Sequence, residues 1–142
     1  MSDYPDSKRC PCGSGQTYGE CCGPLHRGRA SGSPTAPTAE RLMRSRYSAF
    51  AVGDGDYLDA TWHRSTREDL QADEVLEWRR LDVLHATAGG PDDDTGTVRF
   101  VAHYWDPSIG EFGEVAELSA FVRERGQWFY TGPADERSGL LR

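Results

Sequence analysis

Apolar residues recur every three or four positions in residues 38–52, the spacing of one face of an α-helix. The apolar positions are Ala39, Leu42, Met43, Tyr47, Phe50 and Ala51. Thr38 can cap the start of such a helix, and Gly53 can end it. We therefore predict an amphipathic helix here. Its opposite side carries Arg41, Arg44 and Ser48.

A second, shorter helix is expected directly after the first. Asp54 or Asp56 can cap it, because a carboxylate accepts hydrogen bonds from the free amides of a first helical turn. Its apolar residues are Tyr57, Leu58 and Trp62.

From about residue 75 onward the pattern changes to the period of two that is typical of strands. Residues 96–105 are the clearest case, with Val98, Phe100, Ala102 and Tyr104 on one face. Strands are predicted at residues 76–87, 96–105, 114–124 and 127–131. Turns rich in Gly, Pro or Asp separate them, which favours an antiparallel meander. Helices followed by an antiparallel sheet indicate an α+β fold, with the helices packed on one face of the sheet.

Length and charge limit the function classes. The 142 residues suffice for one compact core and a small appendage. The net charge of −7 works against binding to nucleic acid or to an anionic membrane surface. The chain has no apolar run long enough to span a bilayer, and its first residues lack the features of a signal peptide. We therefore expect a cytoplasmic protein without membrane contact.

The most specific chemical signal is a cluster of cysteines near the N-terminus. The four cysteines of the chain are Cys10, Cys12, Cys21 and Cys22. Thiolates gathered in so short a segment suit one tetrahedral metal ion, above all zinc, with each sulfur about 2.3 Å from the ion. The neighbouring Lys8 and Arg9 are expected to offset the thiolate charge. The segment has few apolar residues, so the metal supplies much of its folding energy, and we expect an accessory to an independently folding globule.

Other interpretations of the cysteines remain open. Two crossed disulfides or buried free thiols are the alternatives, although clustering in a chain without marks of secretion favours metal. Cys21 and Cys22 can pair with each other only in a strained ring. His26 is a candidate fifth ligand, for which four thiolates leave no coordination position.

The run Cys10-Pro11-Cys12-Gly13-Ser14-Gly15, followed by Tyr18 and Cys21-Cys22, resembles the SEC-C motif. This motif is a zinc-binding knuckle best known at the C-terminus of the SecA translocation ATPase. The resemblance implies that the four cysteines are the ligands of one structural zinc ion. It also implies a protein partner in secretion or at the ribosome.

Four further segments resemble the YchJ family, which joins such a knuckle to a nuclear transport factor 2-like cone. The segments are Arg44–Phe50, Thr61–His63, Glu117–Phe121 and Gln127–Tyr130. The resemblance implies a curved antiparallel sheet wrapped around helices, and no particular activity. The expected organisation is a flexible N-terminus (1–9), a knuckle (10–23), a linker (24–37), the cone (38–133) and a C-terminal tail (134–142).

Chemistry inside the cone would centre on Glu117, which shares a strand face with Ser119 and the apolar Phe121. A desolvated carboxylate there suits general-base catalysis. Arg46 and His63 are its candidate partners, with His103 a further one, and Trp62, Trp128 and Tyr130 are candidates to line a pocket. The structural interpretation is favoured: Glu117 and Arg46 form an ion pair that fastens the helix to the sheet, and the aromatic residues form core.

Three hypotheses of function follow. The first is a zinc-containing interaction protein in which the knuckle docks a partner and the cone is a second binding module. The second is an enzyme that acts on a small molecule in the cone through Glu117. The third, RNA or ribosome binding through basic residues near the knuckle, is opposed by the net charge of −7. Cones of this kind often dimerise through the sheet, so a homodimer is also expected.

Overall fold

The computed structural model describes residues 4–32, 34–67, 76–134 and 139–141. Its helices are η1 (Tyr18–Glu20), α1 (Cys22–Ser31), α2 (Ala39–Val52) and α3 (Gly55–Ala60). Its strands are β1 (Glu77–Ala88), β2 (Thr95–Asp106), β3 (Glu111–Glu124), β4 (Gln127–Pro133) and β5 (Gly139–Leu141). The α+β class is therefore confirmed. None of the helices in these residues is long and apolar enough to cross a membrane.

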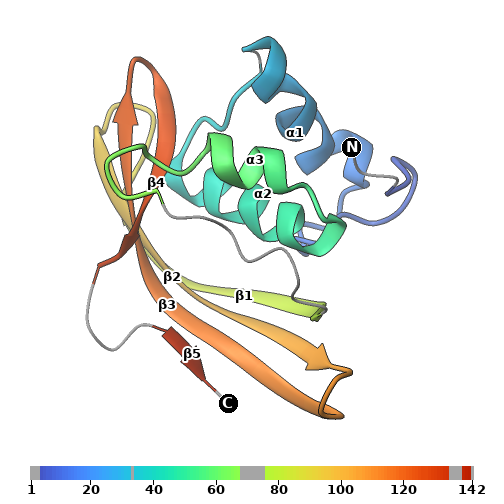
Figure 1. Ribbon diagram of the computed structural model, residues 1–142. Helices are drawn as coiled ribbons and strands as arrows, with labels where there is room; N and C mark the ends of the chain where they lie inside the picture. Colours follow the sequence, from blue (N-terminus) through green and yellow to red (C-terminus); the bar gives the residue numbers. More distant parts are fainter. Residues whose placement is uncertain (1–3, 33, 68–75, 135–138, 142) are drawn as a thin grey trace.

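The strands form one antiparallel sheet in the order β1-β2-β3-β4. The sheet is bent, and α1, α2 and α3 lie over its concave side, so that sheet and helices together form a cone (Figure 1). The short strand β5 pairs with β3 at Glu114–Ala116, whereas β4 pairs with β3 at Ser119–Glu124. Residues 139–141, predicted as part of a C-terminal tail, thus join the sheet.

Helix α2 begins and ends as its sequence predicts. The Thr38 hydroxyl accepts a hydrogen bond from the Arg41 amide at 3.1 Å, and Gly53 ends the helix in the left-handed region at φ 80°. Leu42, Met43 and Tyr47 are buried on the sheet side. Two expectations are wrong: Phe50 is 46 % exposed, and Ser48, which was expected on the opposite polar side, is fully buried. That side is covered by a second layer, formed by the cysteine segment and α1.

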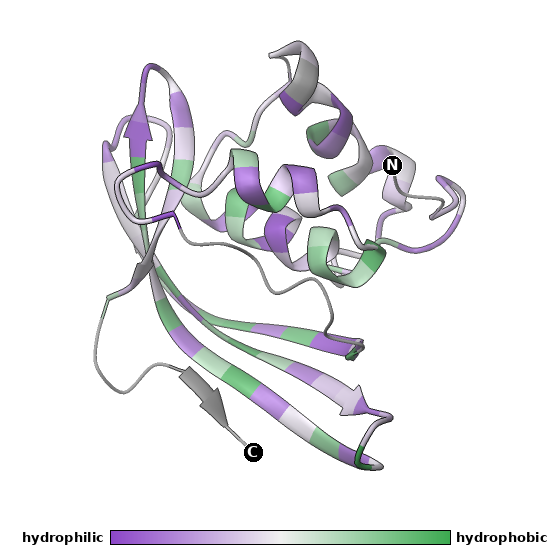
Figure 2. Ribbon diagram, viewed as in Figure 1, coloured by the Kyte–Doolittle hydropathy of each residue, from purple (hydrophilic) through white to green (hydrophobic). Residues whose placement is uncertain are grey.

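Helix α3 is capped by Asp54, whose side chain accepts from the Tyr57 amide at 3.1 Å. In the sheet, the predicted alternation is confirmed: Val98, Ala102 and Tyr104 of β2 are buried on one face. Hydrophobic and hydrophilic residues alternate along β2 and β3 (Figure 2). This pattern places one face of the sheet against the helices, and no helix of the described residues covers the other face.

Two segments expected to be loose are ordered. Residues 24–31, predicted as part of a linker, belong to α1, in which Leu25 and His26 are buried. Within residues 4–9, Tyr4 donates from its hydroxyl to the Arg9 carbonyl at 2.6 Å, and Lys8 accepts at its carbonyl from the Tyr18 amide at 2.7 Å. The cysteine segment is therefore held from both ends instead of being hinged on a flexible connection.

Candidate metal centre

The four cysteines come together because the chain turns back on itself between the two pairs. Arg9 and Thr17 form an isolated bridge, and the Cys10 amide donates to the Gln16 carbonyl at 2.9 Å. Gly13 and Gly15 take φ values of 80° and 91°, which a side chain would strain. Cys21 then follows η1 and Cys22 opens α1.

The geometry of the sulfurs fits one ion. All four lie within 4.8 Å of one another, and the cysteines are between 0 % and 4 % exposed. The Cys12 and Cys21 sulfurs are 3.6 Å apart, and those of Cys21 and Cys22 are 3.9 Å apart. A regular tetrahedron with bonds of about 2.3 Å has edges of about 3.8 Å. All four cysteines are free, so the disulfide alternative is wrong. The cluster could bind a metal ion, as the motif implies.

The acidity of the thiols also favours a cation between them. Hydrogen bonds with Cys12 and Cys22 lower the pKa of Cys10 to about 3 despite its burial. Hydrogen bonding to Cys10 and Cys12, with desolvation, raises the pKa of Cys22 well above its ordinary value. The neighbouring thiols thus stabilise one thiolate, at Cys10, and oppose the ionisation of a second, because a group that donates a hydrogen bond to a thiolate must keep its proton. A bound cation would let all of them ionise.

The cation that contacts the sulfurs comes from α2. Arg41 places a guanidinium nitrogen 3.8 Å from the Cys21 sulfur and 3.9 Å from that of Cys22. Burial lowers the pKa of Arg41, but the charges of Cys22 and Cys21 outweigh it, so that its pKa is raised. The Lys8 ammonium lies over the Tyr4 ring at 5.7 Å, so among these two cations it is the Arg41 guanidinium that is seen in contact with the sulfurs.

Two hydroxyls complete the surroundings of the cluster, and both lie within hydrogen-bond distance of a sulfur. The Ser14 oxygen is 3.1 Å from the Cys21 sulfur, and the Ser48 oxygen is 3.5 Å from the Cys10 sulfur. The contact with Cys10 explains why Ser48, a polar residue of α2, is buried. Its hydroxyl faces the cluster instead of solvent.

Backbone contacts dock the cysteine segment on α2. Arg44 donates to the Cys12 carbonyl at 3.0 Å, and Arg41 donates to the Cys21 carbonyl at 3.2 Å. The cysteines belong to the same buried cluster of side chains as Leu42 of α2. The segment therefore packs as a part of the main core instead of lying beside it as an appendage.

His26 is held by two neighbours and is not a fifth ligand. Its Nε2 is 2.8 Å from the Ser45 carbonyl, which only accepts, so this nitrogen carries a proton. Its Nδ1 contacts the Tyr18 hydroxyl and accepts from it. Burial lowers the pKa of His26, which agrees with a neutral ring. The histidine joins α1 to α2 beneath the cysteine cluster.

In the cone interior, Arg46 and Glu117 are linked through a third residue and not paired directly. Arg46, 7 % exposed, donates to the Leu58 carbonyl at 2.8 Å and to the Thr61 hydroxyl at 2.7 Å. Its guanidinium lies 4.7 Å from the centre of the Tyr130 ring, and the Tyr130 hydroxyl donates to Glu117 at 2.7 Å. Burial lowers the pKa of Arg46 to about 10. The predicted direct ion pair is thus wrong, although the predicted link between helix and sheet is present.

The remaining candidates lie apart from Glu117. Its immediate partner is Ser119, whose hydroxyl donates to the same carboxylate oxygen that Tyr130 contacts. His63 pairs with Glu124 at 2.9 Å, at the β3–β4 hairpin. His103 contacts Asp82 at 2.9 Å, on the opposite face of the sheet from Glu117. The structure therefore unites Glu117 with Ser119, Tyr130 and Arg46, and separates it from both histidines.

A buried cysteine cluster seated on a nuclear transport factor 2-like cone defines the class: a SEC-C motif protein with a second, NTF2-like domain. The family model for the middle NTF2-like domain of YchJ matches residues 38–133, and the model for the SEC-C motif matches residues 7–24. The chain belongs to the YchJ-like family, as the sequence resemblance indicates.

Several relatives have the same extent as this chain. A UPF0225 protein of Corynebacterium glutamicum is 50 % identical over 130 residues, which cover 90 % of this chain and 98 % of the relative. A UPF0225 protein of Streptomyces coelicolor is 44 % identical over 122 residues, covering 85 % of this chain and 90 % of that one. The names of these relatives state no activity.

Two solved structures share the fold. The solution structure of a SEC-C motif containing protein from Rhodopseudomonas palustris has a TM-score of 0.72 at 35 % identity, covering 86 % of this chain and 94 % of that one. The crystal structure of a SEC-C motif containing protein from Psychrobacter arcticus has a TM-score of 0.75 at 27 % identity, covering 94 % of this chain and 85 % of that one. Both names carry the motif that the cysteine cluster forms here.

Proposed function

We propose that the protein binds one structural zinc ion and works as a protein-interaction module of the cytoplasm. In this proposal the cysteine segment docks a partner protein and the cone is a second binding module. The observation that carries it is the closed arrangement of Cys10, Cys12, Cys21 and Cys22. Four thiolates fill a tetrahedral ion and leave no position for substrate, so the ion shapes a surface instead of performing catalysis.

The surface available for docking is the outer loop of the cysteine segment. Residues 13–16 are exposed or partly exposed, and so are the neighbouring Lys8, Arg9 and Arg27. The inner side of the segment is occupied by its contacts with α2, so a partner has access to the outer loop and to these exposed neighbours. The SecA-like resemblance of the motif favours a partner in secretion or at the ribosome.

Zinc is tested by elemental analysis of protein purified without oxidation. We expect about one zinc per chain, and loss of the ion in Cys12→Ser, since a structural site needs all four ligands. Arg41→Gln should lower zinc affinity about tenfold or more, because groups that support the ligands contribute at this level. Lys8→Gln is the matched control and should leave affinity unchanged. A wild-type chain without a stoichiometric transition metal would refute the proposal.

Docking is tested with a variant that keeps the cluster and changes the loop. Arg9→Glu combined with Gln16→Glu alters exposed side chains, and its zinc content should remain that of the wild type. We expect such a variant to lose the partner proteins that wild type enriches, whereas Arg79→Glu on β1 keeps them. An unchanged set of partners in the loop variant counts against docking through this segment.

Acid/base catalysis on a small molecule in the cone is the alternative, with Glu117 as base. The hydroxyls of Ser119 and Tyr130 both donate to one oxygen of this carboxylate. Because these two hydroxyls hold the carboxylate in place, a structural role of Glu117 is favoured over a catalytic one. Glu117→Gln should then lower stability and leave partner binding intact.

RNA binding and dimerisation are further proposals of different weight. The net charge of −7 opposes RNA binding, for which a salt-dependent gel shift is the test. A homodimer through the sheet has support from Phe112, which is 75 % exposed and makes an edge-to-face contact with Trp105 at 4.7 Å between ring centres. Phe112→Ser should then convert a dimer to a monomer in light scattering, and a monomeric wild type would refute it.

A further inference from the structure

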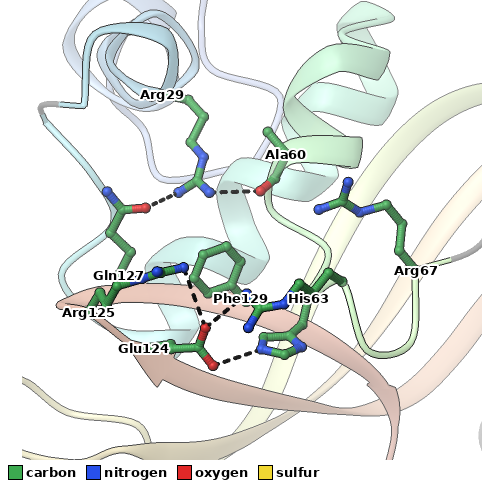
Figure 3. A pocket seen from close by; sticks show the side chains of 9 residues that line it. Arg29, Ala60, His63, Arg67, Glu124, Arg125, Gln127 and Phe129 are labelled. Atoms are coloured by element: carbon green, nitrogen blue, oxygen red, sulfur yellow. Dashed lines mark hydrogen bonds and ion pairs between the residues drawn. The ribbon is translucent and has the colours of Figure 1, made fainter.

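A second site lies away from both the cysteine cluster and Glu117. It is a pocket of about 420 Å³ at the point where the ends of α1 and α3 approach the β3–β4 hairpin (Figure 3). Small-molecule sites in proteins range over roughly 300–1,000 Å³, so this volume admits a metabolite. The charged and titratable residues that line it are Arg29, His63, Arg64, Arg67, Glu124 and Arg125.

The charge of this pocket is opposite to that of the protein. Four arginines line it against one glutamate, whereas the whole chain has 23 acidic and 16 basic residues and a net charge of −7. A hollow lined by an excess of one charge attracts ligands of the opposite charge. The lining therefore suits an anionic ligand.

Arg29 is fixed in place by uncharged partners. Its guanidinium donates to the Gln127 side-chain oxygen at 2.6 Å and to the Ala60 carbonyl at 2.8 Å, and it lies 4.9 Å from the centre of the Phe129 ring. Burial lowers its pKa. A partly desolvated guanidinium held in this way is already oriented, so a ligand does not have to bear the entropy of ordering it. The contacts also unite α1, α3 and β4 at the pocket (Figure 3).

Glu124 shows how the other donors converge on an oxyanion. It contacts Nε2 of His63 at 2.9 Å, a guanidinium nitrogen of Arg64 at 3.3 Å and one of Arg125 at 3.7 Å. A single carboxylate thus holds three donors toward one region of the pocket (Figure 3). A second carboxylate, that of Asp59, lies 3.6 Å from a guanidinium nitrogen of Arg67. Four arginines still exceed these two negative charges, so the pocket retains a positive charge for a ligand.

We propose that this pocket binds a small molecule through a doubly charged oxyanion group, of the kind that a phosphate monoester carries. Guanidinium groups suit phosphate because their planar forks donate two parallel hydrogen bonds to it. A phosphate dianion matches the excess of positive charge better than a single carboxylate does. His63, which the sequence suggests as a partner of Glu117, belongs to this site instead.

The test is a titration of the full chain with glycerol 2-phosphate, followed by the backbone amide signals of His63, Gln127 and Phe129 in NMR spectra. Sodium chloride at equal ionic strength is the reference. We expect saturable shifts of these amides with the phosphate ester and none with chloride. Equal shifts in both titrations overturn the proposal.

Charge variants test which arginines contribute to binding of the phosphate ester. Arg64→Gln with Arg125→Gln removes two exposed charges and should weaken binding at least about tenfold, because charge-assisted hydrogen bonds are lost. The matched control is Arg79→Gln with Arg80→Gln, two exposed arginines of β1, which should leave binding unchanged. An equal loss in both double variants overturns the proposal.

Glu124→Gln provides a test of opposite sign. It removes the anion that competes for the same donors, so binding of glycerol 2-phosphate should become tighter by a few-fold, on the order of the contribution of one charge pair at the surface. Unchanged or weaker binding contradicts the role given to Glu124. Succinate in place of the ester distinguishes ligand classes: tighter binding of this dicarboxylate overturns the assignment to phosphate.

Discussion

Removal of the proposed metal should destabilise the whole protein as one cooperative unit, because the cysteine segment and the cone share a core. Cys10, Cys12, Cys21 and Cys22 are buried together with Leu42 of α2. If the proposed ion leaves, the four thiols are free to separate, and the segment would lose the contacts that dock it on α2. The perturbation is therefore felt in the sheet, although every ligand lies within the first 22 residues.

The structure sets a lower limit on the size of this effect. Tyr18 and Leu25 are 3 % and 5 % exposed beneath the cluster. Exposing such side chains costs about 2 kcal/mol each, or about 4 kcal/mol together. A change of 1 kcal/mol shifts the melting temperature of a domain of this size by about 3 °C, so the expected fall is at least about 12 °C. Structural zinc contributes up to about 10–16 kcal/mol in isolated fingers, which would leave the metal-free chain unfolded.

Differential scanning calorimetry with and without a strong chelator measures the effect, and the aromatic circular dichroism signal reports the environment of Trp128 and Trp78. We expect a single transition in both samples, at a much lower temperature with chelator. Arg27→Gln, which removes an exposed contact with Asp6, should melt with the wild type. The reasoning is refuted if the chelator leaves the main transition in place, or if a small separate transition disappears while the cone melts as before.

Three further predictions concern single residues. Burial lowers the pKa of His26, so its contribution to stability is complete above its unfolded pKa of about 6.5 and is lost as the pH falls below that value. The unfolding free energy of His26→Gln should therefore depend less on pH in this range than that of wild type, which urea titration can measure. Arg46→Lys should lower the unfolding free energy by about 2 kcal/mol, because one ammonium cannot replace two guanidinium hydrogen bonds and the ring contact. An unchanged midpoint of the urea titration contradicts this. Gly28→Ala should cost about 1–3 kcal/mol, because the new Cβ would lie too close to the backbone of Pro34, whereas Gly55→Ala meets nothing within 4 Å and is the control.

The parts of the fold that depend on local signals could be predicted from the sequence. Helix α2 has its cap at Thr38 and its end at Gly53, and β2 alternates through Val98, Ala102 and Tyr104. These signals act over a few residues, so a single sequence contains them in full. The cysteine spacing is equally local, which is why the four sulfurs could be expected at one point.

The parts that depend on contacts between distant segments could not be predicted. Arg41, Arg44 and Ser48 look like the polar side of a surface helix, and nothing near them in the sequence shows that the cysteine segment covers them. Helix α1 has a weak apolar pattern and contains Pro24 and Gly28, so it resembles a connection. The pocket combines residues about 100 positions apart, such as Arg29 and Gln127, whose contact exists only in the folded chain.

The way in which β4 and β5 share one side of β3 has a consequence for solubility. An unpaired strand exposes a row of amides and carbonyls on which another chain can add a strand, and this is a route to aggregation. Here two short strands, one after the other, cover that row at Ser119–Glu124 and at Glu114–Ala116, while the outer strand β1 on the far side is interrupted by two bulges. A chain shortened before Gly139 would uncover part of β3, and it should form fibrous or amorphous deposits at concentrations at which the full chain stays dispersed.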